Sequence, residues 1–337
     1  MKKSLFVFLL LLGTLVSCSK KDQEKCAFVP DTKGIVIDLK IEALEDSLPS
    51  ITSKQQLVDF FARHPVVRDH FFGRDQYPND SIFINEMYNR FINPHLDTLL
   101  METHRVFGDL SELKKNFTEA FTHIKYYYPQ FRVPKVQTII SGFQTDLMVS
   151  DTLIIVGLDY YLGKGAKYKP QLYDYLLRRY NKDFIVPSVM LLYAIDNKTN
   201  KTNLADQTVL ADMIAYGKAY YFAKRMLPCL ADSILMGYKA DEMKGSMDNE
   251  DKIYIRLVEN EVLYSTSHKI KEKYISERPK TLEIGEKCPG RIGTWIGWRI
   301  IESYSEKHPD VALPQIMALP DPEKIFKEAK YRPQGNR

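Results

Sequence analysis

Seven histidines are the side chains best suited to hold a catalytic metal or to move a proton, but their spacing does not assemble a site. No two of them lie four residues apart, so no helix presents two imidazoles one turn apart, the pairing that binds zinc in many hydrolases. They are His64, His70, His95, His104, His123, His268 and His308. The sequence also lacks a Gly-x-Ser-x-Gly elbow, and Gly163-Lys164-Gly165-Ala166 lacks the spacing of a phosphate-binding loop. These patterns favour a noncatalytic protein, with a metal-dependent hydrolase of peptidase type, built on a discontinuous site, as the alternative.

Cys18 is the residue whose chemistry the sequence predicts most directly. Lys2 and Lys3 precede an apolar run that extends from Leu5 to Val16, and the small Ser17 stands just before the cysteine. This order is that of a lipoprotein signal, and the apolar run is too short to remain as a membrane-spanning helix. We therefore expect cleavage after residue 17, lipidation of Cys18, and attachment to the membrane through the lipid.

Three further cysteines, Cys26, Cys229 and Cys288, follow the predicted cleavage site. The envelope permits disulfides, and an odd number leaves at least one thiol unpaired within the chain. We favour a disulfide between Cys229 and Cys288. The wide spacing and the lack of a C-x-x-C pair do not indicate a thiolate metal site, and no cofactor is predicted.

A segment near the C-terminus could form a binding surface. In Cys288–Tyr304, Ile292, Ile296 and Ile300 share one helix face, while Gly293 and Gly297 lie one turn apart and would allow another backbone to approach closely. Tight packing is one interpretation. The other is a groove lined by Arg291, Trp295 and Arg299, in which Arg299 requires a carboxylate, a carbonyl or solvent. Asp159, which follows an apolar strand, is a further candidate because a loop there could present it to a ligand.

The rest of the chain predicts a mainly helical α+β domain. Helical periodicity begins after Ser53, and strands are predicted at Val136–Ile140 and Thr152–Val156. Helices are expected again at Tyr173–Tyr180, Thr208–Leu227 and Lys252–Tyr264. We therefore divide the chain into a signal peptide (1–17), a lipidated tether and entry segment (18–50) and a single globular domain (51–337).

The distribution of charge excludes one class of partner. The formal net charge is +4, and it falls by two when Lys2 and Lys3 are removed with the signal peptide. Acidic and basic residues are interspersed, whereas a nucleic-acid-binding protein needs a concentrated basic face. No nucleic-acid partner is expected, and the sequence leaves the oligomeric state open.

Several segments resemble the gliding-motility lipoprotein GldB family of Bacteroidetes. The resemblance is carried by Tyr127–Pro129, Ser141–Phe143, Gly157–Gly163, Met213–Lys218, Glu261–Thr266, the Arg291–Arg299 region and Lys324–Pro333. It covers nearly the whole chain after the signal and is strongest beyond about residue 120. It implies an envelope lipoprotein associated with gliding motility and type IX secretion. It implies protein partners in the envelope, but no reaction.

The order of the elements also resembles, more distantly, predicted zinc-dependent peptidases with a zincin-like fold. Those proteins carry His-Glu-x-x-His on one helix and an acidic residue before a glycine on the next. Here the corresponding segments read Leu191–Asn197 and Tyr216-Gly217, so neither supplies metal ligands. The resemblance implies a degenerate zincin-like domain without a metal, in which Tyr216 becomes a possible partner-binding residue.

These observations predict a noncatalytic lipoprotein that acts as a component or partner-binding scaffold in the envelope. Ser19 favours sorting to the outer membrane, in either leaflet. A glycan-binding outer-membrane lipoprotein is a second alternative, because the chain contains 21 tyrosines whose rings suit sugars as well as proteins. Both tryptophans, however, lie on one predicted helix, which fits a local patch better than an extended sugar platform.

Overall fold

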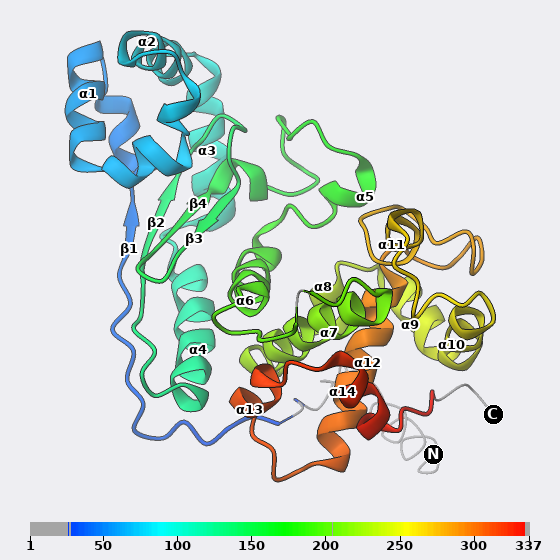
Figure 1. Cartoon of the computed structure of the whole chain (residues 1–337). Coiled ribbons are helices and arrows are strands. Elements are labelled where there is room, and N and C mark those ends of the chain that lie inside the picture. Colours follow the sequence, from blue (N-terminus) through cyan, green and yellow to red (C-terminus); the bar gives the residue numbers. More distant parts are fainter. Residues whose placement is uncertain (1–25, 27, 204, 334–337) are drawn as a thin grey trace, which may run out of the picture.

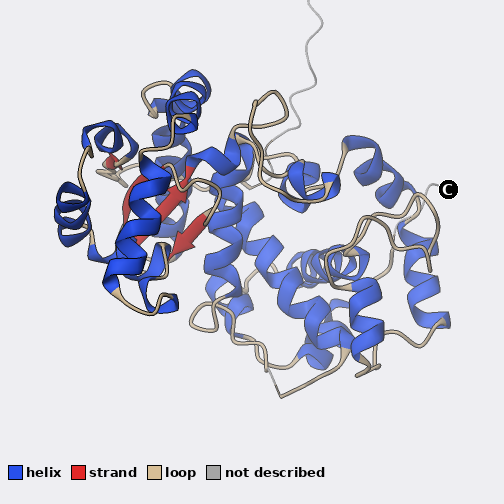
Figure 2. Ribbon diagram, turned by 90° about the horizontal axis from the view of Figure 1, so that it is seen from above, coloured by secondary structure: helices blue, strands red, loops and turns tan. Residues whose placement is uncertain are grey.

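A small four-stranded sheet lies beside a larger set of helices in the computed structural model of the chain (Figures 1 and 2). The structure describes residues 26, 28–203 and 205–333. Cys18, Ser19 and the predicted signal peptide lie outside the described residues. The helices and strands confirm the mainly helical α+β class, whereas the zincin-like architecture stays a prediction.

The sheet has the strand order β1-β2-β4-β3. β1 (Ile41–Ala43), β2 (Lys135–Ile139) and β4 (Leu153–Gly157) run parallel, and β3 (Leu147–Val149) pairs antiparallel with β4 at one edge. β2 and β4 are buried almost throughout, as expected of parallel strands covered on both faces. Their carboxyl ends lie at the same edge of the sheet, so the loops that follow them are neighbours.

The segment 39–50 belongs to the folded part of the chain. Leu39, Leu44 and Leu48 are buried, β1 pairs with β2, and the short helix η1 (Glu45–Ser50) follows β1 directly. The entry segment that we predicted at 18–50 therefore includes the strand β1. This strand was missed because three residues of strand are too few for alternation to be recognised in the sequence.

The N-terminal helices lie beside the sheet (Figure 1), and their aromatic side chains pack in the core. Ser53 begins the first helix with a capping box, in which its hydroxyl accepts from Gln56 N–H while the Gln56 side chain accepts from Ser53 N–H. Phe60, Phe61 and Phe83 form contacting aromatic pairs in the core. The elements of this region are α1 (Lys54–Arg63), η2 (Val67–Phe71), η3 (Arg74–Gln76), α2 (Asp80–Phe91), α3 (His95–Phe107) and α4 (Ser111–Tyr127).

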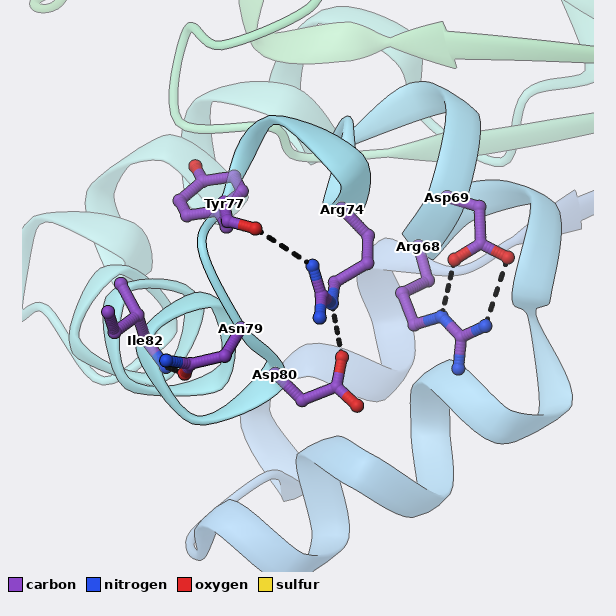
Figure 3. A network of polar contacts seen from close by, with 7 residues as sticks. All are labelled: Arg68, Asp69, Arg74, Tyr77, Asn79, Asp80 and Ile82. Carbon is purple, nitrogen blue, oxygen red and sulfur yellow. Dashed lines mark hydrogen bonds and ion pairs between the residues drawn. The ribbon is translucent and has the colours of Figure 1, made fainter.

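Arg74 organises the approach to α2 (Figure 3). Arg74 donates to the carbonyl oxygen of Tyr77 at 3.0 Å and also to the carboxylate of Asp80, the first residue of α2. Asn79 caps the same helix by accepting from Ile82 N–H at 3.0 Å. Arg68 forms a separate two-pronged ion pair with Asp69, at 2.6 and 2.9 Å. The bonds of Arg74 and Asn79 fix the turn between η3 and α2, and with it the position of Tyr77.

The C-terminal half is helical and centres on α7 and α12. Of the two glycines predicted to allow a close approach, Gly297 lies where these helices cross: a methyl group there would collide with the carbonyl of Met213, and one on Gly217 would collide with the carbonyl of Gly297. Gly293 lies elsewhere, against Tyr274 and Ile275. The helices of this half are α5 (Asp174–Leu177), η5 (Lys182–Phe184), α6 (Ile185–Ile195), α7 (Val209–Met226), α8 (Asp232–Met236), α9 (Ala240–Asp248), α10 (Glu250–Glu259), α11 (His268–Tyr274), α12 (Ile292–Lys307), α13 (Leu313–Ala318) and α14 (Pro322–Ala329).

The disulfide joins Cys26 to Cys229, so the predicted bond between Cys229 and Cys288 is wrong. The N-terminal segment passes the end of α7, where the Arg225 guanidinium lies 4.1 Å from the ring centre of Phe28. Cys26 therefore reaches Cys229, with 4.3 Å between the two Cα atoms. Cys288 is instead a buried free thiol in the segment before α12, and burial raises its pKa to about 12.

Candidate functional site

A pocket of about 540 Å³ opens beside the carboxyl end of β4. Asp159, Tyr160, Leu162 and Gly163, from the segment that follows this strand, line one part of it. Ligand sites in open sheets of parallel strands often lie at this end, because loops from neighbouring strands converge there. The remaining walls come from the residues around α5, from the start of α9 and from the segment before α12.

Asp159 shapes this site from within. Its carboxylate is buried and accepts three hydrogen bonds: from Ser141 N–H at 2.9 Å, from the Ser141 hydroxyl at 3.2 Å and from Phe143 N–H at 2.7 Å. Burial raises the pKa of Asp159, while these donors oppose the rise. The side chain therefore ties the loop after β2 to the loop after β4. We predicted Asp159 as a possible partner contact, but only 1% of it is exposed, which makes it a structural residue.

The loop after β2 is also held from the N-terminal helices. Gln144 donates to the Phe72 carbonyl at 3.1 Å, and the Thr145 hydroxyl donates to the Phe71 carbonyl at 2.8 Å. On the other side, Tyr160 donates to the Phe143 carbonyl at 2.7 Å and Tyr180 to the Asp146 carboxylate at 2.9 Å. These contacts make a supported wall for the pocket. Sequence reasoning did not foresee them because they join segments far apart in the chain.

Four lysines are among the residues that line the pocket. Lys164 and Lys169 come from the loop after β4, Lys239 precedes α9, and Lys280 lies before α12. All four are exposed, and none forms an ion pair with a carboxylate in the part of the chain that the structure describes. Arg178 also lines the pocket, but it is paired with Glu242 at 2.6 Å. The sequence indicated only the basic glycine loop at Gly163–Ala166, because the other lysines are brought together by the fold.

Tyrosines form much of the remaining surface. Tyr160, Tyr168, Tyr175 and Tyr180 line the pocket, and each is partly buried. Burial raises the pKa of Tyr160 to about 12 and raises that of Tyr180 as well. Both hydroxyls therefore stay protonated at neutral pH. The pocket combines neutral aromatic rings with a surplus of unpaired positive charge, and Asp174 is the one carboxylate of its lining that is engaged neither with Arg178 nor with the loop after β2.

Arg291 and Trp295 lie elsewhere and are not accessible to a partner. Arg291 donates to the Tyr220 hydroxyl at 2.6 Å and to the Met236 carbonyl, and its Nε lies 3.1 Å from the Glu277 carboxylate. Trp295 is 1% exposed, within the core around α12. The predicted groove at these two residues is therefore a packed interior, and the tight-packing interpretation of the helix holds there.

Arg299 has the charged partners that we predicted it would need. It pairs with Glu250 at 3.4 Å and with Glu302, and the Tyr331 hydroxyl donates to the same Glu250 oxygen at 2.6 Å. The cluster therefore links α10, α12 and the C-terminal segment. Tyr216, which is 38% exposed on α7, remains a surface residue. Neither Arg299 nor Tyr216 lines the pocket beside Asp159.

Within the described ranges, no three His, Cys, Asp or Glu side chains gather into a possible metal site. Leu191 and Leu192 occupy the helix positions compared above with a zinc motif. They line a cavity of about 420 Å³ together with Leu147 and Leu176. Histidines in the structure make isolated contacts, such as His123 Nδ1 with the Met226 carbonyl at 2.7 Å.

The fold and these contacts define a mainly helical α+β protein with a lysine- and tyrosine-lined pocket at the carboxyl end of its parallel strands. None of the described helices has the length and apolar character needed to cross a bilayer. The family model "Gliding motility protein GldB" matches residues 25–333, so the chain belongs to this family of gliding-motility lipoproteins. No curated protein and no solved structure was found to match the chain.

Proposed function

We propose that the protein is a noncatalytic scaffold of the outer membrane, anchored by lipid at Cys18, which binds a protein partner of the gliding and secretion machinery. The observation that carries this proposal is the family match over residues 25–333. The signal pattern that ends at Cys18 supports the anchor. The pocket beside Asp159 supplies an accessible surface with lysine and tyrosine side chains for a partner.

The contacts of the charged residues support a structural role for them rather than a catalytic one. Asp159 is saturated by donors of one loop, Arg291 is bound to a hydroxyl, a carbonyl and a carboxylate, and Arg299 is held between two glutamates. A catalytic group must reach the reacting atoms of its substrate. Each of these side chains is instead committed to a neighbour within the fold.

The glycan-binding alternative has less support from the aromatic residues. Both tryptophans, Trp295 and Trp298, are buried at 1% exposure. Sugar platforms are built from exposed aromatic faces. The tyrosines of the pocket could still contact a sugar, so this alternative is kept as an outcome of the experiments below.

Two measurements test the proposed function. Crosslinking in intact cells followed by purification of the lipoprotein should recover a defined envelope protein, and Cys18→Ala should abolish both lipid attachment and this recovery, because the partner lies at the membrane. A Cys18→Ala protein that is processed normally and stays on membranes after a salt wash would contradict the anchor. Elemental analysis that finds about one tightly held zinc per chain, with peptidase activity lost on chelation, would favour the hydrolase.

A further inference from the structure

We propose that the pocket beside Asp159 binds an acidic peptide segment of the partner, a stretch of chain with several neighbouring Asp or Glu side chains. This inference rests on the proposed function, because it names the chemistry by which the scaffold recognises a protein. It concerns the cavity of about 540 Å³ lined by residues of the loop after β4, α5, the start of α9 and the segment before α12.

The arrangement of charge favours a ligand with more than one negative group. Lys164, Lys169, Lys239 and Lys280 come from three separate stretches of the chain and border one pocket. Their ammonium groups form no ion pair with any carboxylate that the structure describes. Because the four groups stand on different walls, a ligand with carboxylates at several positions would satisfy them better than one with a single charge.

The acidic residues of the pocket do not cancel this surplus. Glu242 is engaged by Arg178 and by Lys239 N–H, and Asp159 by Ser141 and Phe143. Asp174 is the remaining carboxylate of the lining, and four lysines outnumber it, so the pocket keeps an excess of positive charge. Unlike charges facing each other across an interface select the partner and accelerate its association.

The tyrosines and the fixed walls suit an extended peptide. Four tyrosine rings offer apolar faces for the carbon atoms of a bound chain. The hydroxyls of Tyr160 and Tyr180 are held within the fold, so these two residues contribute their rings. The loop after β2, next to Asp159, is held by the Asp159 carboxylate and by the carbonyls of Phe71 and Phe72 at the end of η2, so little ordering is needed when a ligand binds. With both tryptophans in the core, the lining favours a peptide over an acidic polysaccharide.

The direct test uses the detergent-solubilised full-length lipoprotein and a fluorescein-labelled hexaglutamate peptide, followed by fluorescence anisotropy at low and high salt. Binding should be at least tenfold tighter than to labelled hexaglutamine, and it should weaken as salt screens the charges. Lys164→Glu combined with Lys169→Glu should reduce the affinity at least tenfold. Equal binding of hexaglutamate and hexaglutamine, or tighter binding of trigalacturonic acid than of hexaglutamate, would overturn the proposal.

The matched control is Lys40→Glu combined with Lys135→Glu. Both lysines are exposed and stand just before β1 and at the start of β2, at the amino end of the parallel strands, and the net charge changes by the same amount. This pair should change the affinity less than twofold, and both double variants should keep the melting temperature of the wild type. An equal loss of affinity in the two pairs would show a nonspecific charge effect and refute the site.

The same variants in cells separate this inference from the proposed function. If wild-type protein recovers its envelope partner and the Lys164/Lys169 variant recovers it at least tenfold less well, the acidic-segment site is supported. Equal recovery by the variant refutes the site while leaving the scaffold function standing. Failure of the wild-type protein to recover any protein contradicts the scaffold function itself, whatever the result with hexaglutamate.

Discussion

The carboxylate of Asp159 holds the loop after β2, so its removal should lower the free energy of unfolding. Asp159→Ala leaves Ser141 N–H and Phe143 N–H without their acceptor, and a buried donor without a partner costs about 1–3 kcal/mol. We expect a lower free energy of unfolding by at least this amount in urea titrations. Asp174→Ala is the control, because Asp174 is an exposed residue of the same pocket, and it should shift stability by less than about 0.5 kcal/mol.

Lys218 presents the reverse case, a base buried without a carboxylate. Its ammonium donates to the Thr202 hydroxyl at 3.0 Å and to the Leu319 carbonyl at 2.7 Å, and the residue is fully buried on α7. Burial lowers its pKa from 10.5 to about 7. Between these two values the unfolded chain binds more protons than the folded one, so the contribution of Lys218 to stability rises with pH across that window.

The measurement is the free energy of unfolding of wild type and Lys218→Met at pH 7 and pH 9. Methionine keeps most of the side-chain volume but does not titrate. The free energy of unfolding of the wild type, relative to that of the variant, should increase by about 1–2 kcal/mol between these pH values. A difference of one bound proton between the unfolded and folded states changes this free energy by at most about 1.4 kcal/mol per pH unit. A difference that stays constant with pH would mean that the buried amine does not change its proton occupancy.

At the level of elements, the crossing of α7 and α12 depends on the absence of side chains at two positions. Gly297→Ala places a methyl group against the Met213 carbonyl, which is backbone and cannot rotate away. Overpacking of this kind costs about 1–3 kcal/mol, so we expect a lower melting temperature and a lower free energy of unfolding. Gly297→Leu should be worse.

Gly245→Ala is the matched control for the helix crossing. Gly245 lies inside α9, and a methyl group there meets no atom within 4 Å. Because glycine costs up to about 1 kcal/mol relative to alanine in a helix interior, this variant should be neutral or more stable than wild type. Equal behaviour of the two variants would show that the crossing tolerates a side chain at Gly297.

Long periodic elements and their packing could be predicted from the sequence, whereas short ones could not. The strand prediction at Val136–Ile140 corresponds to β2, and Thr208–Leu227 contains α7 with its cap at Thr208. The helix predicted at Lys252–Tyr264 ends at Glu259, since Glu261 takes a left-handed conformation that stops it. β1 and β3 span three residues each, so their existence depends on their neighbours in the sheet.

The candidate site was only partly within reach of sequence reasoning. Asp159 stood out because it follows an apolar strand, and Gly163–Ala166 stood out as a basic glycine loop, but the contributions of Lys239 and Lys280 depend on how distant segments meet. Arg291 and Trp295 stood out for their residue types, but Arg291 is bound within the fold and Trp295 is buried. Residue type alone does not distinguish a binding hot spot from a core anchor, because large aromatic and guanidinium groups serve both uses.

For the molecule as a whole, the disulfide between Cys26 and Cys229 joins residues 203 positions apart. Replacing both cysteines by serine should lower the free energy of unfolding by about 2–4 kcal/mol, in the usual range for a native disulfide. The segment 28–38 should also become more open to protease. Limited trypsin digestion should then cut at the exposed Lys33 sooner than in wild type, and reduced wild-type protein should behave like the variant. An unchanged rate of cleavage at Lys33 would contradict this role.

The same bond sets the length of the tether between the proposed lipid anchor and the folded body. Cys26 is eight residues after Cys18, so the disulfide limits the distance from the lipidated residue to the body to about 28 Å. Without the bond, the tether would extend to Leu39, the first buried core residue of the chain that the structure describes. Its maximum length would then be about 75 Å. Under the proposed anchor, the redox state of this cysteine pair would set the largest distance between the body and the membrane.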